Sequence, residues 1–171
     1  MYPLCICLKV IRSFGKFPIL YIYCLGGKMN LDEFFSRINF ITYEKPPERT
    51  REIKRFLNYI NGEIPEKDIQ SILEFIQSGK YLICWLYAVV FSSFQCLINH
   101  GIWNEALAKA YHEYLDELGW EYELEIVEKM LSEGDIESVR EFCLDSKLAD
   151  EENNTYFMTS TVWHGKDYGK L

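Results

Sequence analysis

The chain has 171 residues, of which 49% are hydrophobic and 26% charged, so it is long enough for one compact domain and short for two. The apolar content excludes an intrinsically disordered chain, 10 Gly and 5 Pro exclude a collagen-like chain, and six Cys are too few for a disulfide scaffold. The formal net charge is −8, and a chain this acidic is repelled by nucleic acids and anionic membranes.

Residues 1–28, the N-terminal extension, differ from the rest of the chain because they carry four bases, no acid and three of the six Cys. A basic start followed by the apolar stretch 17–25 is typical of a secretory signal, although small residues for cleavage are scarce. Basic residues interrupt each apolar run before it reaches the roughly 20 residues that a bilayer requires. Three interpretations remain open: leader sequence upstream of a true start at Met29, an element added to the core, and a signal or anchor.

Three helices are predicted after Met29. Asn30 followed by Glu33 has the form of a capping box and opens a helix over residues 31–40. Residues 46–62 and 65–79 each begin with proline and end with glycine, which predicts two further helices. The apolar residues that recur at helical spacing in these segments are Leu31, Phe34, Phe35, Ile38, Ile53, Phe56, Leu57, Ile60, Ile69, Ile72, Leu73 and Ile76.

Residues 81–99 contain no charged side chain over nineteen positions, which raises the question of a membrane span. Ala88, Ser92, Gln95 and Asn99 recur at intervals of four, three and four, so one small and polar stripe follows an otherwise apolar helix. Such a stripe suits packing against a neighbouring helix. We therefore predict the central buried helix of a bundle.

The second half continues in helices. Residues 102–118 are amphipathic and end at Gly119, residues 120–132 repeat the pattern, and Asp135 can cap a last short helix. Short connections imply mostly antiparallel neighbours. The predicted fold is all-α, a bundle of about six or seven helices in antiparallel hairpins that forms an acidic domain over residues 29–152.

Residues 153–171 form a different C-terminal tail. Its stretch 156–163 is rich in Thr, Val and aromatic residues, which is typical of a strand or an extended arm. We therefore predict that the tail is extended or β-like.

Two sets of residues have part of the pattern of a metal site. His112, Glu113 and Asp116 have part of the spacing of a zinc-binding helix, but the second His and a third ligand are missing. Cys96 and His100 lie four residues apart. We predict no metal, no cofactor and no catalytic residue.

The three cysteines outside the N-terminal extension are Cys84, Cys96 and Cys143. Cys84 is twelve residues from Cys96, about 18 Å along one helix, which is too far for a shared metal ion or a disulfide. All three are expected to be small buried hydrophobes in a reducing compartment. Since no base stands beside a nucleophile, the sequence favours a protein without enzymatic activity.

The acids are concentrated in residues 113–152, which hold fifteen Asp and Glu against three Lys and Arg. This segment is either a solubilising surface or a docking face for a basic protein. The residues proposed for contact with a partner are Glu117, Glu121, Glu125, Glu128, Asp135 and Glu137.

The preferred hypothesis is a cytoplasmic inhibitor, of the immunity or anti-defence kind, that neutralises a basic protein such as a nuclease or nucleic-acid-binding protein. It predicts no direct binding to nucleic acid and no membrane association. The alternative is a helical-repeat-like adaptor that binds a peptide or protein through an aromatic groove. It is suggested by Gly101, Gly134 and Gly165, which lie 33 and 31 residues apart.

Overall fold

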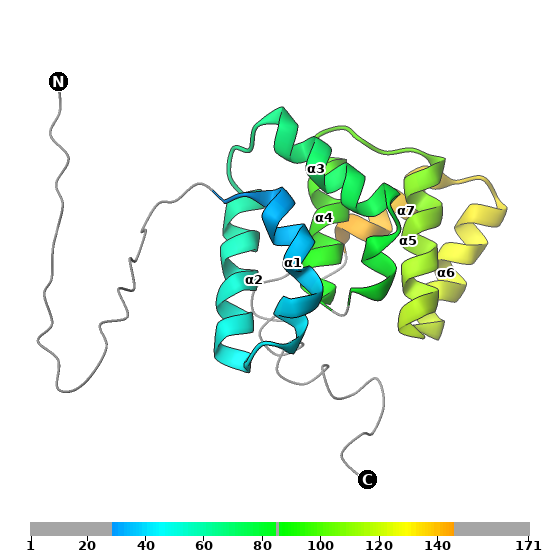
Figure 1. Cartoon of the computed structure of the whole chain (residues 1–171). Coiled ribbons are helices and arrows are strands. Elements are labelled where there is room, and N and C mark those ends of the chain that lie inside the picture. The colour runs from blue at the N-terminus through cyan, green and yellow to red at the C-terminus, as the bar shows by residue number, and fades with distance from the viewer. Residues whose placement is uncertain (1–28, 85, 146–171) are drawn as a thin grey trace, which may run out of the picture.

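Seven α-helices and one short 3₁₀ helix build the part of the chain that the structure describes, residues 29–84 and 86–145 of a computed structural model (Figure 1). They are α1 (Leu31–Tyr43), α2 (Pro46–Ile60), α3 (Glu66–Gln77), η1 (Lys80–Ile83), α4 (Tyr87–Asn99), α5 (Glu105–Leu118), α6 (Glu121–Ser132) and α7 (Ile136–Asp145). These residues contain no strand, so the predicted all-α multi-helix bundle is confirmed. The predictions for the N-terminal extension and for the C-terminal tail lie outside the described residues.

Side-chain caps fix where several helices begin. The side chain of Asn30 accepts a hydrogen bond from the backbone N–H of Glu33 at 3.2 Å, which confirms the predicted start of α1. Asn104 caps α5 by accepting from the N–H of Leu107 at 3.0 Å. The prediction that this helix starts at residue 102 is therefore wrong by three residues, because the Asn104 side chain takes the capping role.

Stacked phenylalanine rings join α1 to the two helices that follow it. The Phe34 ring lies 4.8 Å from that of Phe56 on α2, and the Phe35 ring lies 4.3 Å from that of Phe75 on α3. All four side chains are buried. Such pairs add about 0.5–1.5 kcal/mol to the burial of their apolar area, so aromatic packing holds α1, α2 and α3 together.

The single helix predicted over residues 81–99 is wrong. The chain forms η1, leaves helical geometry at Cys84, where φ is −91° and ψ is 111°, and begins α4 only at Tyr87. The cause is a tertiary contact, since the hydroxyl of Tyr114 donates to the backbone carbonyl of Cys84 at 2.9 Å. That buried hydrogen bond satisfies a carbonyl that a continuous helix would have used internally.

Helix α4 is the centre of the bundle, as predicted. Eleven of its 13 residues are buried, and it contacts α2, α3 and α7 (Figure 1). On the predicted polar stripe, Ser92 is buried and the Gln95 Nε2 donates to the carbonyl of Cys143 on α7 at 2.9 Å. The stripe therefore faces a neighbouring helix. Within residues 29–84 and 86–145, we find no helix with the length and apolar character needed to cross a membrane.

Helices α5, α6 and α7 follow one another through short turns. Gly119 ends α5 with φ at +67°, a conformation that favours glycine, as the sequence predicted. The Trp103 indole N–H donates to the carbonyl of Ile136 at 2.8 Å and so ties the segment before α5 to the start of α7. Gly101 and Gly134 likewise end α4 and α6 in this conformation.

Candidate functional site

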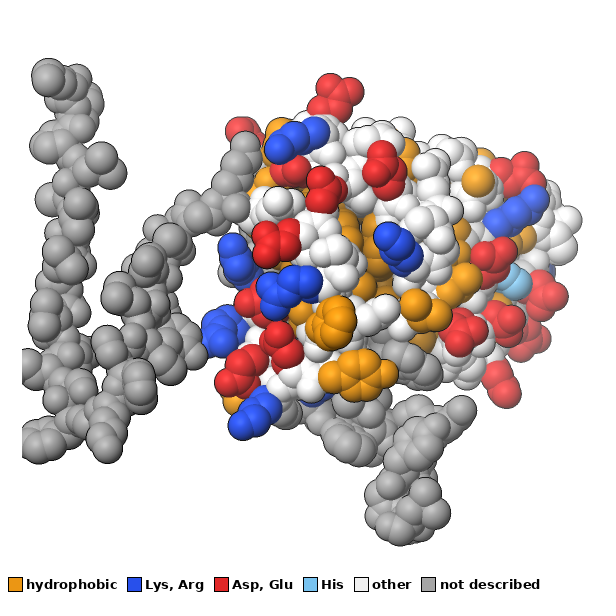
Figure 2. Space-filling view, in the orientation of Figure 1, with side chains coloured by type: hydrophobic (Ala, Val, Ile, Leu, Met, Phe, Trp, Pro, Cys, Tyr) orange, Lys and Arg blue, Asp and Glu red, His pale blue; other side chains and the backbone are white. Residues whose placement is uncertain are grey.

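Charge is distributed unevenly between the two halves of the bundle. Residues 29–80, which include α1, α2 and α3, hold nine acids and eight bases, whereas residues 105–145, which include α5, α6 and α7, hold thirteen acids and three bases. Figure 2 shows Asp and Glu side chains gathered over α5 and α6, while most of the Lys and Arg side chains in view lie over the other half. The excess negative charge belongs to one side of the molecule.

All six residues predicted to contact a partner are exposed. Glu121, Glu125 and Glu128 lie at spacings of four and three on α6, so they share one face of that helix. Glu117 lies near the end of α5. We use the term acidic surface for the exposed carboxylates of α5 and α6 that form no ion pair with another described residue: Glu113, Asp116, Glu117, Glu121, Glu125 and Glu128.

The other two predicted contact residues are engaged locally. The Asp135 carboxylate accepts hydrogen bonds from the backbone N–H and the hydroxyl of Ser138, at 3.0 and 2.6 Å, and these bonds lower its pKa. Glu137 pairs with Arg140 at 2.8 Å. Asp135 therefore caps α7, as predicted. Its hydrogen bonds lie within α7 and not with the carboxylates of α5 and α6.

Ion pairs leave the acidic surface uncompensated. Within the described ranges the pairs join Arg37 to Glu44, Lys109 to Glu105, and Arg140 to both Glu137 and Glu141. On α5, the Lys109 ammonium lies 2.6 Å from the Glu105 carboxylate, and this hydrogen bond and charge lower the pKa of Glu105. No member of the acidic surface lies within 4.0 Å of a basic group in residues 29–84 and 86–145, so these carboxylates are available to an external cation.

A groove of about 410 Å³ borders the acidic surface between η1 and α5. Leu82, Ala106 and Ala110 supply apolar walls, and Tyr81 and Glu113 meet there from the two elements. The Tyr81 hydroxyl donates to the Glu113 Oε2 at 3.1 Å. Tyr81 is only 2% exposed, and burial, followed by the charge and hydrogen bond of Glu113, raises its pKa well above the usual value.

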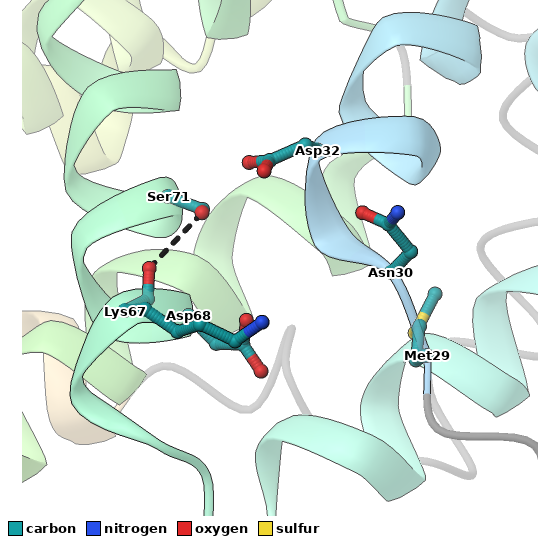
Figure 3. Close-up of a pocket in the computed structure, with 6 residues that line it drawn as sticks. All are labelled: Met29, Asn30, Asp32, Lys67, Asp68 and Ser71. Atoms are coloured by element: carbon teal, nitrogen blue, oxygen red, sulfur yellow. Dashed lines mark hydrogen bonds between the residues drawn. The ribbon is translucent and has the colours of Figure 1, made fainter.

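A second, more polar pocket of about 270 Å³ lies between the first turns of α1 and α3. Figure 3 shows Asp32 on one side and Asp68 and Ser71 on the other. Asp68 is 6% exposed and accepts a hydrogen bond from the hydroxyl of Tyr59, whose pKa is raised to about 12 by burial and by Asp68. Among the described residues that line this pocket, Ser71 is the one hydroxyl side chain, and its Oγ donates to the backbone carbonyl of Lys67 at 3.1 Å rather than to a side-chain base.

Comparisons of this chain with protein-family models, with curated proteins and with solved structures found no match.

The Cys96 Sγ lies 3.8 Å from the His100 Nδ1, but these two candidate ligands have no third beside them in residues 29–84 and 86–145. The described part of the chain contains no group of three His, Cys, Asp or Glu side chains placed to hold a metal ion. His112 is half-buried, while Glu113 and Asp116 are exposed. The His100 Nδ1 lies 2.8 Å from the carbonyl of Cys96, so His100 interacts with the end of α4.

Cys84, Cys96 and Cys143 are free and buried, as predicted. Burial raises the pKa of Cys84 to about 12 and that of Cys96 to about 11. Since the thiolate is the reactive form, these thiols are poor nucleophiles at neutral pH.

Proposed function

We propose that this chain is a non-enzymatic, cytoplasmic protein-binding domain that neutralises a basic protein partner. In this proposal it is an inhibitor of the immunity or anti-defence kind, and its acidic surface covers a basic active site or nucleic-acid-binding cleft. The observation that carries the proposal is the set of exposed carboxylates on α5 and α6 with no basic group within 4.0 Å in the described part of the chain. Complementary charge accelerates the encounter and competes with a polyanionic substrate for the same cleft.

The energetic cost of the acidic surface supports a role beyond solubility. Like charges three or four residues apart on a helix destabilise it by about 0.2–0.5 kcal/mol per pair. Glu121 with Glu125, and Glu125 with Glu128, are such pairs. The half containing α1, α2 and α3 carries nearly equal numbers of acids and bases, so this cost is concentrated in the half that contains α5 and α6.

The proposal is tested by capture of the partner with the full chain immobilised, from a lysate of cells that carry its gene, followed by stepwise elution with NaCl. We expect a protein of high isoelectric point to elute at moderate salt, because screening weakens the complementary fields. Replacement of Glu117, Glu121, Glu125 and Glu128 by Gln should lower its affinity by about a hundredfold, since rim charges each contribute modestly.

The matched control replaces four exposed acids of the other half by Gln: Glu33, Glu63, Glu66 and Glu74. This variant changes the net charge equally but leaves α5 and α6 intact. We expect it to retain nearly full affinity. Equal losses in both variants, or retention of the partner at high salt by the unmodified chain, would contradict docking through the acidic surface.

The second candidate, an adaptor that binds a peptide through a groove between helices, is favoured by the apolar walls of the groove at α5. Its binding would depend little on salt. Tyr81 is the one aromatic residue among the described side chains that line this groove, so the aromatic contacts that this candidate needs are few. The same elution separates the two candidates.

A further inference from the structure

Glu113 differs from the other carboxylates of the acidic surface in how its side chain is held. It lines the groove between η1 and α5, and its Oε2 accepts the hydrogen bond from the Tyr81 hydroxyl. Tyr81 is itself fixed because its ring contacts Phe94 and Tyr114, at centroid distances of 5.9 Å each, in the buried core. An otherwise mobile surface carboxylate is therefore oriented by a rigid, buried donor.

The charge of Glu113 has no counterion among the residues that the structure describes. Lys109, which lies one turn before it and also lines the groove, pairs instead with Glu105 on the preceding turn. The Oε1 of Glu113 receives no hydrogen bond from the described residues. The groove thus presents an oriented, solvent-accessible anionic oxygen to which a cationic donor can bind.

The walls of the groove select among cations. Ala106 and Ala110 are small residues on the α5 side, and Leu82 forms part of the η1 side. Gln77, Asn104 and Lys109 also line the groove, but most of its lining is apolar. A mainly apolar groove that leads to a carboxylate suits a long side chain with an aliphatic stem and a charged end. Lysine and arginine both have this form. Arginine fits better, because its planar guanidinium offers paired donors to a carboxylate and is more weakly hydrated than the ammonium group of lysine.

We propose that the groove between η1 and α5 receives a single arginine side chain of the basic partner, with Glu113 as its counterion and Tyr81 as the positioning residue. This inference rests on the proposed function and assigns the partner one defined contact. It also places a contact residue outside the six that the sequence predicted. The remaining carboxylates supply the surrounding field, whereas Glu113 supplies recognition of one side chain.

The test uses the full chain and three blocked tripeptides, Gly-Arg-Gly, Gly-Lys-Gly and Gly-citrulline-Gly, followed by NMR. We expect the arginine peptide to shift the signals of Tyr81, Ala106 and Ala110 with a Kd on the order of 1 mM, a value typical of one small contact. The lysine peptide should bind severalfold more weakly. The citrulline peptide, which has the shape of arginine without its charge, should give no shift.

Two exposed positions provide variants that separate charge from shape. Glu113→Gln removes the counterion and Ala106→Leu narrows the groove while retaining the charge, and each should weaken the arginine peptide about tenfold. Glu128→Gln is the matched control, since it removes one charge of the same surface outside the groove. Tyr81→Phe should weaken arginine binding but not the response to lysine, because it releases the carboxylate without removing it.

Three results would overturn the inference: no shift at about 10 mM arginine peptide, equal effects of Glu113→Gln and Glu128→Gln, or full binding by Ala106→Leu. None of these affects the capture experiment, which depends on Glu117, Glu121, Glu125 and Glu128. Conversely, a groove that binds the arginine peptide in a chain that captures no basic protein would contradict the proposed function alone.

Discussion

The half of the bundle formed by α1, α2 and α3 and the half formed by α5, α6 and α7 are built in the same way and differ in their surfaces. Both begin with an asparagine-capped helix, at Asn30 and at Asn104, and both bury clusters of aromatic rings. Only the second half carries thirteen acids against three bases. Since the balanced half folds around an equivalent core, the acidic excess is not a requirement of the fold.

The two halves share α4. Phe91 on α4 stacks on Trp120 with ring centroids 5.4 Å apart and contacts the rings of Tyr111 and Tyr114. The other faces of α4 contact α2 and α3. The difference between the halves is therefore confined to their surfaces, while the core is continuous.

The largest expected effect tests that continuity. Phe91→Ala removes a fully buried ring and should lower the free energy of unfolding by about 3–5 kcal/mol, the usual cost of such a cavity. When urea unfolding is monitored by hydrogen exchange, the amides of α2 and of α6 should lose their protection in one shared transition. Phe40→Ala is the control, because Phe40 is 73% exposed and its loss should change stability by less than about 0.5 kcal/mol.

Two separate transitions in the unmodified chain would show that the halves are independent units joined by α4. In that case, a comparison of their surfaces within one cooperative fold would no longer hold.

The helices of both halves were largely predictable because their signals are local. Caps such as Asn30 and Asp135 and stop signals such as Gly119 act within one turn, so sequence alone locates them. The break before α4 was not predictable. No Gly or Pro marks it, and its cause, the hydrogen bond from Tyr114 to the Cys84 carbonyl, joins residues 30 positions apart.

The candidate site also has one part that the sequence predicts and one part that it does not. The acidic surface follows from composition, because a run of carboxylates on amphipathic helices has to face water. The groove does not follow from composition, because Tyr81 and Glu113 are 32 residues apart and neither belongs to a motif. Asp135 and Glu137 were predicted to contact a partner from charge alone, and that pattern did not reveal their local partners, Ser138 and Arg140.

A smaller effect is expected from salt, and it should act on one half. Raising NaCl from about 0.05 to about 0.5 M shortens the screening length to a few ångströms and so relieves repulsion among the surface carboxylates. Amide exchange from local opening should slow severalfold in α6 and change less in α2, whose two acids and four bases place opposite charges within one turn of each other.

The variant with Glu121, Glu125 and Glu128 changed to Gln should lose most of that salt response, because the repelling pairs are gone. A salt response of equal size in α2 would mean that salt stabilises the whole bundle rather than relieving repulsion on α6. The two halves would then not differ in electrostatic repulsion.

The smallest expected effect concerns the caps, which differ in chemistry between the halves. Asn30 caps α1 with a neutral amide, whereas Asp135 caps α7 with a carboxylate whose pKa is lowered by its hydrogen bonds from Ser138. A carboxyl group whose pKa is lower in the folded state than in the unfolded state stabilises the fold. For Asp, this contribution is complete at pH values above the unfolded pKa of about 3.9, and it is lost as the pH falls through the folded pKa. Below pH 4, α7 should therefore fray before α1 does.

Asp135→Asn tests this cap directly, because asparagine is an equally good cap at every pH. The variant should match the unmodified chain at pH 7 and remove the extra loss of protection in α7 amides on acidification. Asp135→Ala should show faster exchange in α7 at both pH values, since no side chain then accepts from the N–H of Ser138. If the Asn variant frays with acid as the unmodified chain does, protonation elsewhere on α6 and α7 controls the end of the bundle. The acid sensitivity of this half would then belong to its surface charge rather than to its cap.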